Sequence, residues 1–162
     1  MCSSDLKALG SMPGFLHVAS GEIFRQLSRF GQLGKQVSSY TNEGKLVPDE
    51  LTVDIWRNHM TVMLKDGIFN PAEQVIILDG IPRTFRQTQL LQQDIEVLRV
   101  FFLKLKDEEA LRRMKARAAK EKRVDDGSDA VMRGRLETFY RETRETLDGY
   151  DGSLIEEVDA TG

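Results

Sequence analysis

Two short runs of β-prone apolar residues, at 75–78 (Val-Ile-Ile-Leu) and 100–103 (Val-Phe-Phe-Leu), constrain the fold of this chain most strongly. Every position in both runs is apolar, so neither run has a face that suits water. Such strands are typical of parallel sheets that helices cover on both faces. The two runs therefore predict central strands, and weaker strand candidates lie near the ends of the chain, at 15–18 and 153–158.

Helical patterns separate these strand candidates, and some carry start or stop signals such as Pro48 and Gly44. We expect helices at 22–30, 33–43, 48–65, 84–93, 108–120 and 129–147. Alternation of strands and helices predicts an α/β fold with a parallel sheet covered by helices on both faces. The length of 162 residues suits a single domain over 1–162.

Composition argues against several classes of protein. The chain has 23 Lys and Arg against 26 Asp and Glu, so a net charge of −3 predicts no attraction of the whole chain to nucleic acid. Its single cysteine, Cys2, excludes an intrachain disulfide and indicates a reducing compartment, and no Cys or His pair has metal-ligand spacing. Because its apolar runs are too short for a membrane span, we expect a cytoplasmic protein with no membrane partner.

The most informative segment follows the strand at 75–78 and reads Asp79-Gly80-Ile81-Pro82-Arg83. Ligand crevices in such sheets lie at the carboxyl ends of the strands. Gly80 would let the backbone approach a ligand closely, and the forked guanidinium of Arg83 would grip phosphate oxygens. An ordinary strand-to-helix turn with a surface arginine explains the segment equally well, so both interpretations stay open.

Two other segments have simple structural interpretations when each is taken alone. Ser20 follows the strand at 15–18 and suits a helix cap, with Arg25 in the first turns of the next helix. Residues 44–50 suit a helix stop, a short loop and a helix that starts at Pro48.

A strongly basic third of the chain spans 112–144. Arg113 and Arg117 are four residues apart in this region and share one helix face. Nearby glutamates balance only part of this charge, so an anion site competes with a solvated helix surface as the explanation. The residues that stand out in this region are Arg113, Arg117, Arg123, Asp125, Asp126 and Arg135.

Taken in order, these segments resemble the adenylate kinase family of nucleoside-monophosphate kinases. The family pattern has a Ser-Thr-Gly-Asp turn with a downstream Arg, a Gly-x-Leu-Val-Pro loop, and Asp-Gly-Phe-Pro-Arg-Thr followed by Gln. An Arg-x-x-x-Arg helix, Arg-x-Asp-Asp and a later Arg complete it, and the match covers about residues 15–162. The resemblance implies a P-loop nucleoside-monophosphate-kinase-like fold, a monomer, ATP and AMP as substrates, and Mg²⁺ as the cofactor that accompanies ATP.

The resemblance also implies roles for particular residues. AMP would be bound by Ser20, Arg25, Lys45, Leu46, Val47, Gly80, Arg83 and Gln87. ATP would be contacted by Arg113, Arg117 and Gly162, and the catalytic arginines would be Arg83, Arg117, Arg123 and Arg135. Asp125 and Asp126 would orient the lid arginines, and Asp79 would lie near the water shell of Mg²⁺, with no direct protein ligand to the metal.

Spacing and base-side residues refine this resemblance. Only five residues separate Arg117 from Arg123, which resembles short-lid members with a lid at about 117–124 and an AMP-binding part at about 19–48. Ser20, Thr84 and Gln87 resemble AMP-specific members, so AMP is favoured as the acceptor over the UMP and CMP of related kinases.

The main departure from the family pattern lies at residues 1–14, which contain neither the first buried strand nor the Gly-x-x-Gly-x-Gly-Lys loop that cradles the ATP phosphates. We therefore expect a fold without that strand and P-loop, and phosphotransfer that is impaired in this polypeptide. A truncation, a variant transcript or a gene-model error would explain the departure. The alternative is a non-catalytic AMP-binding or regulatory relative of the family.

Overall fold

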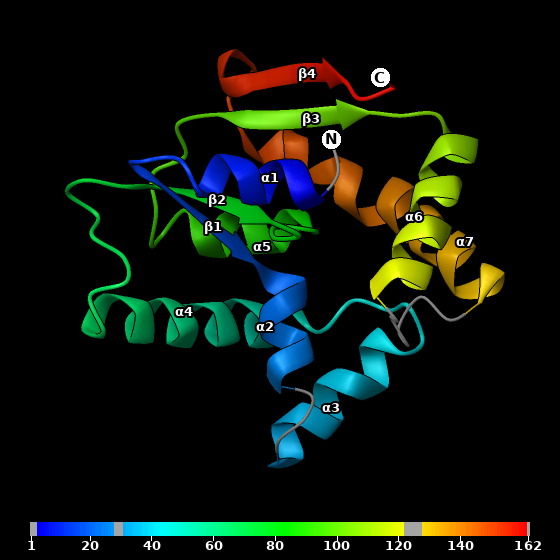
Figure 1. Cartoon of the computed structure of the whole chain (residues 1–162), viewed down its shortest axis with the longest axis horizontal. Helices are drawn as coiled ribbons and strands as arrows, with labels where there is room; N and C mark the ends of the chain where they lie inside the picture. The colour runs from blue at the N-terminus through cyan, green and yellow to red at the C-terminus, as the bar shows by residue number, and fades with distance from the viewer. Residues whose placement is uncertain (1–2, 28–30, 122–127, 162) are drawn as a thin grey trace.

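Figure 1 shows the computed structural model, which describes residues 3–27, 31–121 and 128–161. The helices and strands up to the middle of the chain are α1 (Ser3–Gly10), β1 (Phe15–Ala19), α2 (Ser20–Leu27), α3 (Gly31–Thr41), α4 (Asp49–Lys65), β2 (Val75–Asp79) and α5 (Phe85–Leu91). They are followed by β3 (Val100–Lys104), α6 (Asp107–Glu121), α7 (Asp129–Thr138), η2 (Phe139–Thr143), η3 (Arg144–Gly149), η4 (Gly152–Leu154) and β4 (Ile155–Asp159). All four predicted strands are confirmed.

The strands form two parallel pairs. In one pair Phe15 of β1 lies opposite Val75 of β2, and in the other Val100 of β3 lies opposite Ile155 of β4. Helices lie between consecutive strands along the chain, so the predicted α/β fold with parallel strands is confirmed. Within the described residues no strand pairs with both β2 and β3, and this division fits the expectation of a sheet without its first strand.

The main core lies between the β1–β2 pair and the helices α4 and α5. It combines Val18 of β1 with Val53, Trp56 and Met60 of α4 and with Leu91 of α5, which is 1% exposed. Helix α1 packs on the same strand pair, against β1 and β2 (Figure 1). The strand ends that carry the candidate site therefore rest on a packed layer.

A second, smaller core joins the helices around the candidate AMP-binding part. Val37 of α3, Val47 of the loop before α4 and Ile55 of α4 are buried together, and apolar side chains of α2 pack against them. This cluster fixes α2 and α3 beside the start of α4. The segment from 20 to 48 is thus built around its own small apolar centre.

The predicted helix at 129–147 consists of three helical forms. After α7, the π-helical turn η2 leads into the 3₁₀ segment η3. Phe139 of η2 stacks on Phe102 of β3 with ring centroids 6.3 Å apart, while η3 packs on α5, where Gln92 donates from Nε2 to the Gly149 carbonyl at 2.8 Å. The change of helical repeat lets one segment make both packing contacts.

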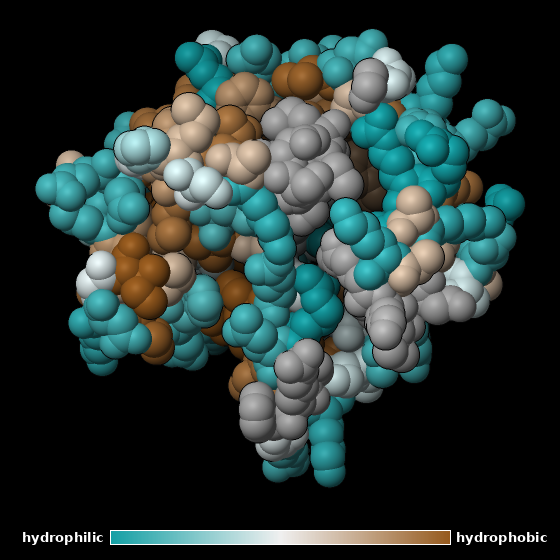
Figure 2. All heavy atoms as spheres, viewed as in Figure 1, coloured by the Kyte–Doolittle hydropathy of each residue, from teal (hydrophilic) through white to brown (hydrophobic). Residues whose placement is uncertain are grey.

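Surface character differs between the two ends of the molecule. Figure 2 shows apolar side chains gathered on the left of this face, where the starts of β1 and β2 and the end of α4 lie in Figure 1. Large exposed hydrophobic residues in or beside these elements are Met12, Phe15, Val62, Leu64, Ile68 and Val75. The end formed by α6 and α7 is mainly hydrophilic (Figure 2). None of the described helices combines the length and apolar character that a membrane span requires.

Candidate functional site

The turn after β2 brings three predicted residues together. Parallel pairing places Ala19 opposite Asp79, so Ser20 and Gly80 are neighbours at the carboxyl ends of their strands. The Ser20 hydroxyl and the Arg83 Nε–H both donate to the Gly80 carbonyl oxygen, each at 2.8 Å. The predicted strand-end turn is thus held to the start of α2, and Ser20 is buried whereas Arg83 is exposed.

Position 80 requires a glycine, both for its backbone conformation and for the space that its neighbours occupy. Its φ is +78°, in the left-handed region that glycine adopts without steric cost. A Cβ at this position would lie 2.7 Å from Ser20 Oγ and 3.0 Å from Arg83 Nη2. The two side chains therefore occupy the space that only a glycine leaves open.

Arg25 lies at the same edge of the strand pair. Its Nη1 would be 3.1 Å from a Cβ on Gly21, so the guanidinium folds back over the first turn of α2. The free amides of that turn carry partial positive charge. Two guanidiniums, one hydroxyl and one helix N-terminus therefore gather where β1 and β2 end, and this combination suits an anion such as a phosphate.

Glu22 lies in the same turn of α2 and pairs with a neighbouring helix. Its carboxylate forms an ion pair with Lys7 Nζ of α1 at 2.5 Å. The hydrogen bond from Lys7 lowers the pKa of Glu22 below its ordinary value. Lys7 thus connects α1 to α2.

Asp79 ends β2 and contacts a residue that sequence reasoning missed. The imidazole Nε2 of His17 in β1 lies 3.3 Å from Asp79 Oδ2, and the His17 side chain is 9% exposed. The contact depends on the register of two strands that are far apart in sequence. A polar residue inside an otherwise apolar strand was the available signal.

The described residues contain no group of three or more His, Cys, Asp or Glu side chains that could hold a metal ion. Mg²⁺ commonly keeps several waters and is held by one or two carboxylates together with substrate phosphates. A partly exposed Asp79 at the strand end suits that kind of second-sphere contact. The site therefore fits a Mg²⁺ ion that arrives with a nucleotide.

The loop before α4 holds the three residues predicted around the adenine. Lys45 is exposed and pairs with Glu43 at 2.7 Å, which raises the pKa of the Lys45 ammonium group. Leu46 is half-buried, and Val47 is buried, with its carbonyl accepting from the Thr52 hydroxyl at 3.2 Å. The loop thus offers an apolar inner side and a charged outer side.

Gly44 brings this loop against α7. Its φ is +72°, and a Cβ there would lie 3.3 Å from Val131 Cγ1 and 3.6 Å from Arg135 Cγ. The predicted helix stop therefore also permits a close approach of two segments that are about ninety residues apart. Arg135, half-buried on α7, is placed beside the candidate adenine loop.

Gln87 is nearly completely covered, with 2% of its surface exposed. Its Oε1 accepts from the Arg83 backbone N–H at 2.7 Å, and its Nε2 donates to Asp49 Oδ1 at 2.9 Å. The Thr84 hydroxyl donates to the same Asp49 oxygen at 2.9 Å and accepts from the Gln87 backbone N–H as the N-cap of α5. The sequence pattern placed Asp49 only within the helix that starts at Pro48 and gave no sign of these contacts.

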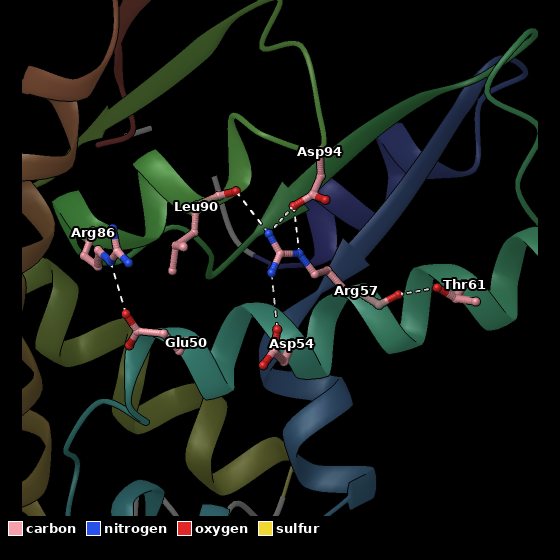
Figure 3. A network of polar contacts seen from close by, with 7 residues as sticks. All are labelled: Glu50, Asp54, Arg57, Thr61, Arg86, Leu90 and Asp94. Atoms are coloured by element: carbon pink, nitrogen blue, oxygen red, sulfur yellow. Dashed lines mark hydrogen bonds and ion pairs between the residues drawn. The ribbon is translucent and has the colours of Figure 1, made fainter.

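The helix behind this turn is attached to α4 by a polar cluster (Figure 3). Arg57 donates from Nε to Asp94 Oδ2 at 2.9 Å, and from Nη1 to Asp54 Oδ1 at 3.2 Å. Arg86 pairs with Glu50 at 3.1 Å near the start of both helices. Figure 3 shows these side chains bridging α4 to α5 and to the residues just after it.

On α6, Glu109 binds two arginines at once. Its carboxylate accepts from Arg112 Nε and from Arg113 Nε, each at 2.6 Å. The hydrogen bond from Arg112 is the largest cause and that from Arg113 the next, and together they lower the pKa of Glu109 to about 2. Arg117 lies one turn further along the helix and is half-buried, and Lys115 pairs with Asp129 of α7 at 2.7 Å. The two helices are thus linked by charge.

Some predicted residues cannot be placed in this geometry. Arg123, Asp125, Asp126 and Gly162 lie outside the described residues. Among the rest, Ser20, Gly80, Arg83 and Gln87 are brought together, and Arg25 joins them at the strand ends.

A family model described as adenylate kinase matches residues 6–154 of this chain. The chain is 34% identical over 166 residues to an adenylate kinase from Clavibacter michiganensis, covering 98% of this chain and 79% of that protein. It is 35% identical over 152 residues to an adenylate kinase from Bifidobacterium longum, covering 90% and 77%, and 32% identical over 167 residues to one from Thermobifida fusca, covering 98% and 84%. With a strand-end turn that carries the family motif and relatives that match along nearly its whole length, the chain belongs to the adenylate kinase family.

Proposed function

We propose that this chain carries the AMP side of the adenylate kinase reaction, in which ATP and AMP give two ADP. The observation that carries the proposal is the meeting of Ser20, Arg25 and Arg83 at the carboxyl ends of β1 and β2. The guanidinium donors suit the dianionic phosphate of AMP, and Ser20 would join them by turning its hydroxyl away from the Gly80 carbonyl. Arg83 holds the acceptor phosphate, because its exposed guanidinium is fixed on the Gly80 carbonyl at the carboxyl end of β2.

The adenine of AMP is assigned to the loop at 45–47, with Val47 as the apolar inner wall. Gln87 is the polar residue assigned to the base edge, and because it is 2% exposed, the groups that cover it must move before a base can reach it. We assign residues 19–48 to the AMP-binding part of the domain. The small apolar core around Val37 supports this assignment, because it joins α2 and α3 to the loop at 45–47 and to the start of α4.

The ATP side is assigned to α6 and α7. Arg113 covers the adenine of ATP, and Arg117, Arg123 and Arg135 gather around the transferred phosphoryl, with Asp125 and Asp126 orienting a lid at 117–124. Phosphoryl transfer depends mainly on positioning and on neutralising charge, so several cations at one cleft supply what it needs. The approach of Arg135 to Gly44 supports the assignment, because it brings an α7 arginine beside the AMP-side loop.

Mg²⁺ would bind with ATP and neutralise charge on its phosphates, with Asp79 contacting the water shell. The residues of the chain then have three tasks: they bind the acceptor phosphate, orient it and exclude water. No residue of the chain needs to act as a covalent nucleophile.

The 162 residues contain no Gly-x-x-Gly-x-Gly-Lys loop, so we propose that a polypeptide of this sequence binds AMP and forms ADP slowly. A coupled assay for ADP formation and a calorimetric titration with AMP test these two statements separately. Rapid turnover would refute the claim of impairment. Tighter binding of UMP or CMP than of AMP would refute the choice of base.

The role of Arg83 is tested by the Arg83→Lys variant. Lysine keeps the charge and loses the fork, so AMP affinity should fall about tenfold. Arg86→Lys is the matched control, since Arg86 is also exposed and lies only three residues away but pairs with Glu50 outside the turn. If both variants bind AMP as the unchanged chain does, Arg83 does not hold the phosphate.

A further inference from the structure

Asp49, the first residue of α4, connects the candidate adenine loop to the phosphate-binding turn. One of its carboxylate oxygens, Oδ1, accepts from Thr84 Oγ1 and from Gln87 Nε2, each at 2.9 Å. Gln87 in turn accepts from the Arg83 backbone N–H at 2.7 Å. A hydrogen-bonded path thus runs from the start of α4 through Gln87 to the backbone of Arg83.

The chemistry of these groups gives the path one polarity. A carboxylate only accepts and a backbone N–H only donates, so the Gln87 amide must direct Nε2 to Asp49 and Oε1 to Arg83. A flipped amide would place oxygen against oxygen and N–H against N–H. Because Gln87 is 2% exposed, water cannot easily replace either partner. The orientation of Gln87 therefore depends on an acceptor at position 49.

We propose that Asp49 is a positioning residue for AMP binding, acting through Gln87 on the turn that carries Arg83. The proposal rests on the proposed function and deepens it. Asp49 does not touch the nucleotide; it holds the Gln87 amide, which holds the Arg83 backbone, whose side chain meets the phosphate. Asp49 is also the first residue of the helix that follows the adenine loop. One residue therefore connects the base side of the site to its phosphate side.

The test compares AMP with adenosine, which has the same base and ribose but no phosphate. In Asp49→Ala the Gln87 amide loses its acceptor and the Arg83 turn loosens, so AMP affinity should fall about tenfold. Adenosine affinity should fall by a clearly smaller factor, because adenosine keeps its base contacts with this region but has no phosphate for Arg83 to hold. Both ligands are titrated against the full chain and followed by NMR shifts of backbone amides.

Three further variants separate positioning from a general effect on folding. Asp49→Asn keeps an acceptor oxygen and should restore AMP affinity to within about threefold of the unchanged chain. Serine suits a helix start but is too short to reach Gln87, so Asp49→Ser should lower AMP affinity as predicted for Asp49→Ala. It therefore keeps the test available if the alanine variant folds poorly. Glu50→Ala removes the neighbouring carboxylate, which pairs with Arg86 at the surface, and should leave both affinities unchanged.

Hydrogen exchange of the Arg83 amide gives a readout that needs no ligand. Its protection should fall in Asp49→Ala and Asp49→Ser and persist in Asp49→Asn and Glu50→Ala. Equal weakening of AMP and adenosine, or unchanged Arg83 protection in Asp49→Ala, would overturn the inference while leaving the proposed function in place. If the unchanged chain does not bind AMP at all, the proposed function fails, and the inference fails with it.

Discussion

Replacing Gly80 by alanine gives a quantitative test of how the strand-end turn is built. Alanine at a φ of +78° is strained by about 1–2 kcal/mol. Alanine also lowers the conformational entropy of the unfolded chain, which offsets about 0.4–1 kcal/mol of that strain. The new Cβ would also lie 2.7 Å from Ser20 Oγ, so the hydroxyl must move away from the Gly80 carbonyl. Losing that hydrogen bond costs about 1 kcal/mol more.

Gly67→Ala isolates the contribution of the neighbours. Gly67 has a φ of +69°, and among the described residues beyond its two chain neighbours no atom lies within 4 Å of the position of a Cβ, so it has a similar backbone strain and no crowding. We therefore expect Gly80→Ala to be less stable than Gly67→Ala by about 1 kcal/mol, which lowers the melting temperature by about 2–4 °C.

Urea unfolding followed by circular dichroism measures the two free energies of unfolding, and calorimetry measures AMP affinity. Only Gly80→Ala should weaken AMP binding, because only its Cβ would displace Ser20 and Arg83. Equal unfolding free energies and equal AMP affinities in the two variants would refute the argument that Ser20, Gly80 and Arg83 form one unit.

Three other predictions concern the layers that support the site. Leu91→Ala should lower the free energy of unfolding by about 2–5 kcal/mol, measured by urea titration, because this side chain is 1% exposed in the main core. Arg57→Ala should lower the melting temperature more than Arg86→Ala does, because Arg57 contacts Asp94, Asp54 and the Leu90 carbonyl whereas Arg86 pairs with the exposed Glu50. Glu109 has a pKa lowered to about 2 in the folded chain, so its stabilising contribution is complete above about pH 4.5 and is lost as the pH falls toward 2. NMR titration of its carboxyl carbon measures this pKa, and a midpoint near 4.5 would contradict the double arginine contact.

The strands and the phosphate-binding turn could be predicted from local patterns. Runs of apolar β-prone residues identified β2 and β3, and the Asp-Gly-x-Pro-Arg segment identified the turn in which Gly80 has a positive φ and Arg83 folds back on it. Such features depend on residues close together in sequence, so a single segment contains the necessary information. The roles of the residues toward AMP and ATP stay predictions.

The tertiary structure decided which of these segments meet. Ser20 and Gly80 are 60 residues apart, and Asp49 and Gln87 are 38 apart, so their contacts follow from strand register and from the packing of α4 on α5. The same is true of His17 with Asp79 and of Gly44 with Arg135. A polar residue read alone is adequately explained as a cap or a surface charge, because its partner is absent from the local pattern. The sequence by itself determined the strands and the strand-end turn, whereas only the packed core, by setting the distances between them, decided that Asp49 and Gln87 hold Arg83 in place.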